Sequence, residues 1–200
     1  MAGVNLELTI LRLALGAMQR SRTIFGDPGN LLPAGSTYGV WTNHRVPDDP
    51  SEWHPRIRRF YDYWLSVAPP GRLPGRQHIA PEDMIALLPR LWMADVFRGP
   101  LRLRYRLVGT EIVRSVQREL TGQWLDEAQP ESVSNPTLSN RYRFIVETGQ
   151  PTWRRGATLW SRDRQHRCVE NCLVPLASDG ATVDKILAMT VLFDTDGREL

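Results

Sequence analysis

The stretch LWMADVFRGPLRLRYRLV, residues 91–108, decides the fold class. From 101 to 108 apolar residues alternate with Arg102, Arg104 and Arg106, a period of two that is typical of a strand with one buried and one wet face. A short Arg-Gly-Pro turn separates this strand from the apolar run 91–97, so the two form a hairpin. The hairpin predicts an antiparallel sheet.

Toward the C-terminus the sequence predicts three more strands, at 151–161, 166–177 and 183–194. Their connections are short and rich in turn residues, which favours antiparallel neighbours. Between the two groups of strands the pattern predicts a helix after Thr110, one further short turn of helix, and a longer helix from Pro136 to Gly149. We therefore expect an α+β domain, a five-stranded antiparallel sheet with helices on one face.

Before the hairpin, a helix is predicted over 57–68. Its apolar residues follow the helical spacing i, i+3, i+4, i+7, i+8 and i+11: Ile57, Phe60, Tyr61, Trp64, Leu65 and Ala68. A second, short helix is predicted to begin at Pro81 and to end before Pro89.

Residues 1–56 do not follow the pattern of the domain. An apolar helix is predicted over 1–25, too short to cross a bilayer, so we expect a docking or dimerisation helix, with a signal peptide or a membrane-surface anchor as alternatives. Residues 26–56 are rich in Gly and Pro and predict a linker or a surface-hugging arm. Residues 195–200 form a tail.

A series of ordered motifs over 57–194 resembles the PAS-like family found as short proteins in alphaproteobacteria. The motifs are YDYWLS (61–66), LPGRQHIAPEDM (73–84), LLPRLWMADV (87–96), LRYRLVGTEIV (103–113), ELTGQWLDE (119–127) and CLVPLASDGATVDKIL (172–187). The resemblance implies a stand-alone sensor or interaction module that regulates a separate signalling protein, such as a histidine kinase, through protein contact. It also implies a homodimer paired through the leading helix, and either a small ligand held between sheet and helices or no ligand and pairing with other proteins alone.

The net charge and the two cysteines limit the partners, compartment and metals that we expect for this chain. The net charge of +3 over 200 residues is too weak to indicate nucleic-acid binding, and a membrane partner is not expected. Two cysteines on one predicted strand, Cys168 and Cys172, are too far apart for a disulfide and are typical of a reducing, cytoplasmic compartment. With His166 they lie on one face of that strand, but such a row cannot close a zinc site, so no metal is expected.

Known cofactor and catalytic motifs are missing from the sequence. The helix 134–148 has no histidine for haem, no covalent haem motif occurs, and Cys172 does not lie in the motif of a flavin photosensor, so haem and photoactive flavin are disfavoured. No nucleophile or metalloprotease motif is present, and no catalytic residue is predicted. Two acids within strands, Asp95 and Glu170, leave open the alternative of a small enzyme with a cone-shaped α+β pocket.

Two sets of residues are the candidates for function. The first would line a ligand pocket between sheet and helices, with plain core packing as the alternative: Tyr105, Val113, Trp124, Phe144 and Trp153. The second would anchor an interface on the leading helix, or else simply cover the sheet: Phe60, Tyr61 and Trp64. If neither role holds, a purely structural dimerisation module with a filled core is the remaining alternative.

Overall fold

Six strands form one sheet in the order β1-β4-β5-β6-β2-β3. A computed structural model describes residues 42–45, 53–130, 136–156, 168–194 and 196–200. All the pairings between the six strands are antiparallel, which confirms the five predicted strands and adds β1 from the arm. The strands are β1 (Thr42–Arg45), β2 (Leu91–Phe97), β3 (Arg102–Val108), β4 (Thr152–Gly156), β5 (Cys168–Leu176) and β6 (Lys185–Phe193).

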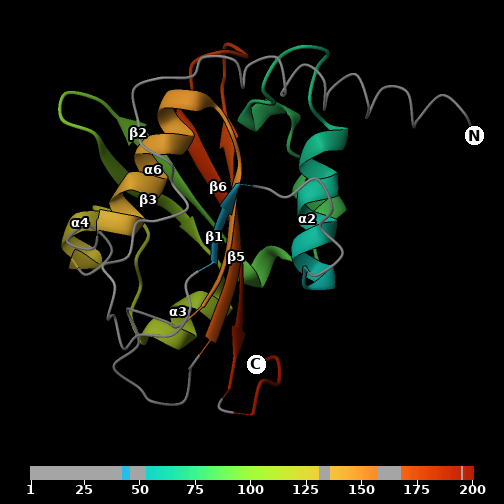
Figure 1. The fold of residues 1–200 in the computed structure, drawn as a ribbon, viewed down its shortest axis with the longest axis vertical. Coiled ribbons are helices and arrows are strands. Elements are labelled where there is room, and N and C mark those ends of the chain that lie inside the picture. Colours follow the sequence, from blue (N-terminus) through green and yellow to red (C-terminus); the bar gives the residue numbers. More distant parts are fainter. Residues whose placement is uncertain (1–41, 46–52, 131–135, 157–167, 195) are drawn as a thin grey trace, which may run out of the picture.

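Helices cover both faces of the sheet, so the α+β class is confirmed but the expectation of helices on one face is wrong. Helix α2 (Pro55–Ser66) lies on one side of β5 and β6. Helices α3 (Thr110–Val116), α4 (Leu125–Ala128) and α6 (Pro136–Thr148) lie on the other (Figure 1). The central strands β5 and β6 are buried at eight consecutive positions, because both of their faces are covered.

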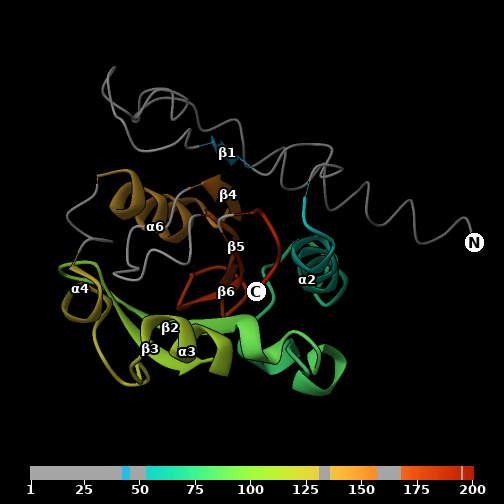
Figure 2. The same ribbon diagram turned by 90° about the horizontal axis from the view of Figure 1, so that it is seen from below.

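Seen from below, β1 and β4 stand at one end of the sheet, and β2 and β3 at the other (Figure 2). Along β3, Leu103 and Tyr105 are buried while Arg104 and Arg106 are exposed, as the alternation predicts. Leu107 departs from this pattern and is exposed.

Local chemistry explains where the helices begin and end. In α2, Pro55 occupies the first turn and the His54 side chain accepts a hydrogen bond from the Arg56 backbone N–H. Helix α3 ends at Gln117, which takes a left-handed φ of 57°. Helix α6 ends at Gly149, also left-handed, as predicted.

The predicted short helix after Pro81 is instead two separate 3₁₀ turns, Pro81–Met84 and Leu88–Arg90. The second turn packs so closely on the start of α3 that a Cβ on Gly109 would overlap the carbonyl oxygens of Leu88 and Pro89. This approach explains why glycine precedes Thr110 in the LVGTE motif.

Several predictions lie outside the described residues: the helix over 1–25, most of the arm over 26–56, and the parts of the predicted strands within 157–167. Of the arm, Thr42–Arg45 pairs with β4, and Trp53 is buried against Trp153. None of the helices in the described ranges is long and apolar enough to cross a membrane.

Candidate functional site

The face of the sheet under α6 carries a row of buried polar side chains. Arg154 on β4 pairs in register with Asn171 on β5, which in turn pairs with Thr190 on β6. Directly paired residues point to the same face, and Arg141 reaches this face from α6. We call Arg141, Thr152, Arg154, Asn171 and Thr190 the buried arginine cluster; all five are less than 9% exposed.

Arg141 joins helix α6 to two strands. Its Nε donates to Thr152 Oγ1 at 2.7 Å, and its Nη1 donates to Asn171 Oδ1 at 2.6 Å. Its Nη2 donates to the backbone oxygens of the same two residues, at 3.1 and 3.2 Å. Four of the five guanidinium N–H groups are therefore oriented by neutral oxygens. Among the described residues, no carboxylate lies within ion-pair distance of Arg141.

Arg154 brings a second positive charge to the same place. Its side chain is 1% exposed. Burial, with a further contribution from the charge of Arg141, lowers the pKa of Arg154 to about 9. Burial likewise lowers the pKa of Arg141 to about 10. Guanidinium groups bind carboxylate and phosphate oxygens through charge-assisted hydrogen bonds, so two arginines on one buried face are a candidate site for such a group.

The five predicted pocket residues do not gather at one site. Tyr105 is buried on the α6 side and donates its hydroxyl to Gln129 Oε1 at 3.1 Å. Val113 and Phe144 are half-buried on α3 and α6. Trp124 lies by the outer edge of β3, under the Arg102 guanidinium and against Phe97.

Trp153 lies on the opposite face from Tyr105. It stacks on Trp53 at a ring separation of 5.5 Å and belongs to the apolar cluster under α2. The reason is the side-chain period of two along β4, which puts Trp153 and Arg154 on opposite faces. A depression of about 290 Å³ elsewhere, near the end of α6, contains none of the five residues.

The predicted interface residues Phe60, Tyr61 and Trp64 are buried within the chain. They pack on β5 and β6, and Trp64 Nε1 donates to the Pro175 oxygen at 3.0 Å. Their role as interface anchors stays a prediction, since burial within the described chain shows only that they pack on the sheet. The alternative reading, that they cover the sheet, matches their contacts.

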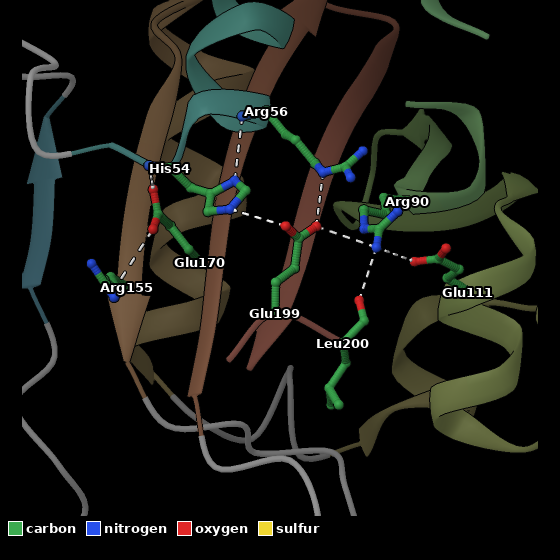
Figure 3. A network of polar contacts seen from close by, with 8 residues as sticks. All are labelled: His54, Arg56, Arg90, Glu111, Arg155, Glu170, Glu199 and Leu200. Carbon is green, nitrogen blue, oxygen red and sulfur yellow. Dashed lines mark hydrogen bonds and ion pairs between the residues drawn. The ribbon is translucent and has the colours of Figure 1, made fainter. Parts of the chain in front are cut away.

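The two strand acids lie in ion-pair settings. Asp95 is partly exposed and lies 3.7 Å from both Arg106 and Lys185. Glu170 is fully buried on the α2 side, where its Oε1 accepts from the His54 backbone N–H at 2.8 Å and from Trp153 Nε1 at 3.0 Å. Its Oε2 lies 3.8 Å from Arg155 Nε (Figure 3). Glu170 thus joins the start of α2 to the sheet.

The cysteines do not gather with other metal ligands in the part of the chain that the structure describes. Cys172 is buried on the α2 side and Cys168 is half-buried; both are free thiols. No group of three His, Cys, Asp or Glu able to hold a metal occurs among the described residues, and His166 lies outside them.

The buried arginine cluster was not predicted from the sequence, although part of its signal was there. Arg141 stands three residues after Leu138 and four before Ile145, in phase with the apolar stripe of its helix. A charged residue at such a position indicates either a long side chain reaching past the core or a buried polar role. The sequence gives no comparable sign that Arg154 is buried. The next residue, Arg155, has the same side chain but is exposed, so residue type does not distinguish the two.

Most of the described chain is similar to a known protein family. The family model described as PAS domain matches residues 53–191. This range begins at Trp53, ends within β6 and includes the five main strands and both helical layers. A search of curated proteins finds no match to the chain.

Proposed function

Because the chain belongs to the PAS domain family, whose members are generally sensor and signalling modules, we propose that it is a ligand-gated sensor without catalytic activity. In this proposal it regulates a separate signalling protein, such as a histidine kinase, through protein contact. The family supports the signalling role. The buried arginine cluster supports the ligand.

The proposed ligand is a small anion that carries a carboxylate or phosphate group. Guanidinium groups bind such oxygens through charge-assisted hydrogen bonds. In this site Arg141 is held in place by four hydrogen bonds, and Arg154 stands on the adjacent strand. Asn171 and Thr190 add neutral polar groups on the same face.

The absence of an acid or base in the cluster supports binding over catalysis. Its described members are two arginines, two threonines and an asparagine, none of which is a general acid or base at neutral pH. Glu170, the acid that the enzyme alternative would use, points to the opposite face.

The signal would pass through the contacts of Arg141. This side chain holds α6 to β4 and β5, so a ligand that draws on the same guanidinium changes how the helix sits on the sheet. A ligand shifts an equilibrium only if it binds two arrangements unequally. The contact between α6 and the sheet is the place where two arrangements would differ.

The test is native mass spectrometry of freshly purified protein, followed by thermal unfolding with succinate, citrate and inorganic phosphate as probes. A ligand at 100 times its dissociation constant adds about 2.7 kcal/mol, which raises Tm by roughly 5–10 °C for a chain of this size. We expect Arg154→Gln to abolish the shift and the exposed Arg104→Gln, used as the control, to retain it.

Two results would contradict the proposal. One is co-purification of a neutral or cationic molecule that Arg154→Gln still binds. The other is a Tm shift by an anion that is the same in wild type and Arg154→Gln, since that anion would be binding elsewhere.

A further inference from the structure

The last residues of the chain fold back on the end of β6. Gly197 takes a φ of +78°, and Asp194 Oδ1 accepts from the backbone N–H groups of Asp196 and Arg198 at 2.8 and 2.9 Å. The turn brings Glu199 into register with Phe193, and the Leu200 N–H donates to the Leu192 oxygen at 3.0 Å. Glu199 and Leu200 therefore lie as a short antiparallel strand on β6.

This short strand fills an edge that β2 leaves open. On one side β6 is paired with β5 as far as Phe193. On the other side its pairing with β2 stops at Met189, because β2 begins at Leu91. The stretch of β6 from 190 to 193 would present an unpaired edge on that side, and an extended peptide can add to such an edge.

Three side chains converge on the Glu199 carboxylate beside this edge (Figure 3). Arg56 Nε lies 2.8 Å and Arg90 Nη2 3.2 Å from Glu199 Oε1, and His54 Nε2 lies 3.2 Å from Oε2. The same Arg90 nitrogen donates to the backbone oxygen of Leu200 at 2.8 Å. The site therefore binds one carboxylate and the backbone oxygen of the residue that follows it.

Contacts that do not involve the tail hold two of these side chains in place. His54 Nδ1 accepts from the Arg56 N–H, which leaves the ring proton on Nε2 to donate to the carboxylate. The backbone of His54 is fixed by buried Glu170. Arg90 is 12% exposed and pairs with Glu111 at 2.9 Å. The site would persist if the tail left it.

The tail itself is held lightly. Residues 196–200 are all exposed, and Leu200, its one large apolar side chain, is 46% exposed. The tail is thus attached by partly exposed ion pairs and few backbone hydrogen bonds, which are weak in water. A segment bound in this way can be displaced by a better ligand for the same site.

We propose that His54, Arg56, Arg90 and the free edge of β6 form a docking site for an extended acidic segment of a partner protein, and that Glu199–Leu200 occupies it as an internal competitor. The partner would supply a Glu or Asp side chain to the three basic groups and pair its main chain with β6. Arg90 also contacts Glu111 in the first turn of α3, so the docking site adjoins the helical layer over the buried arginine cluster.

The test measures binding of a labelled peptide to the full chain by fluorescence anisotropy. The probe is a capped peptide Thr-Val-Ser-Glu-Leu-Thr, whose only charge is the Glu carboxylate, with the Gln-for-Glu peptide as its control. Glu199→Gln weakens the internal competitor, so we expect ~10-fold tighter peptide binding than in the wild type, where the site is free only a small fraction of the time. The matched control Glu82→Gln removes an exposed acid far along the chain and should bind as the wild type does.

A second variant keeps the test decisive. Arg56→Gln added to Glu199→Gln should return the affinity to that of the Gln-for-Glu peptide. Equal affinity in the wild type and Glu199→Gln, or no effect of Arg56→Gln, would overturn the proposal. So would a drop in Tm of more than ~5 °C in Glu199→Gln, since the tail would then be a structural clasp. The assay contains no small anion, so its outcome is independent of the proposed ligand.

Discussion

The two faces of the sheet bury different chemistry. Under α2 the described side chains form the larger apolar cluster, dense in aromatic rings, with one buried acid that accepts from backbone and indole N–H groups and pairs with Arg155. Under α3, α4 and α6 the apolar cluster is smaller, and two buried arginines border it. The comparison indicates that the α2 face contributes more apolar burial to stability, whereas the α6 face combines less apolar burial with two buried charged side chains.

The largest effect is expected from Trp64→Ala on the α2 face. Trp64 is 1% exposed and donates to the Pro175 oxygen, so truncation removes a large buried ring and a hydrogen bond. We expect a loss of about 4 kcal/mol in the free energy of unfolding, measured in urea. The control Ile85→Ala removes an exposed side chain and should cost less than about 0.5 kcal/mol. A loss of self-association with unchanged stability would restore the interface role of Trp64.

A smaller loss is expected from removing Glu170, the buried acid on the same face among the described residues. Glu170→Ala leaves the His54 N–H and the Trp153 indole N–H buried without their acceptor, at a cost of about 3 kcal/mol. Glu170→Gln keeps an acceptor oxygen and should cost about 1 kcal/mol. Urea unfolding of both variants measures the difference. If Gln costs as much as Ala, the negative charge rather than the hydrogen bonds is what this face requires.

The smallest effect concerns pH. Burial raises the pKa of the Cys172 thiol to about 12, whereas a thiol in the unfolded chain ionises near 8.5. The folded state therefore keeps a proton that the unfolded state releases, and the stability this contributes is present below pH 8.5 and lost as pH rises toward 12. Relative to pH 8, wild type should lose about 2 kcal/mol more by pH 10 than Cys172→Ala does. Identical slopes would mean that the thiol is not desolvated.

Much of the architecture follows from local patterns in the sequence. The alternation along β3 predicted the hairpin and the antiparallel sheet, and the spacing of Ile57, Phe60 and Trp64 predicted helix α2. The fold class and the family were recognised from ordered motifs. The expectation that the helices lie on one face of the sheet was wrong, because α2 lies on the face opposite to α3, α4 and α6. The nearly continuous apolar run of β6, interrupted only by Thr190 after Lys185, indicates burial on both faces, a signal that the hairpin does not carry.

The sites could be predicted much less well. Tyr105 and Trp153 are both apolar residues of strands, but only the pairing register shows that they lie on opposite faces. Arg141 meets Asn171 across 30 positions of sequence, and Glu199 meets His54 across more than a hundred. Contacts between residues so far apart in the sequence do not follow the helix or strand period, so a periodic pattern cannot predict them.

By itself, the sequence determined the kinds and order of the secondary-structure elements, because helix and strand periods are set by residues a few positions apart. Tertiary structure alone decided which charges came together: Arg141 and Arg154 under α6, and His54, Arg56 and Arg90 around Glu199. The reason is physical, since the interaction of two charges depends on the distance and burial that folding creates and not on their separation along the chain.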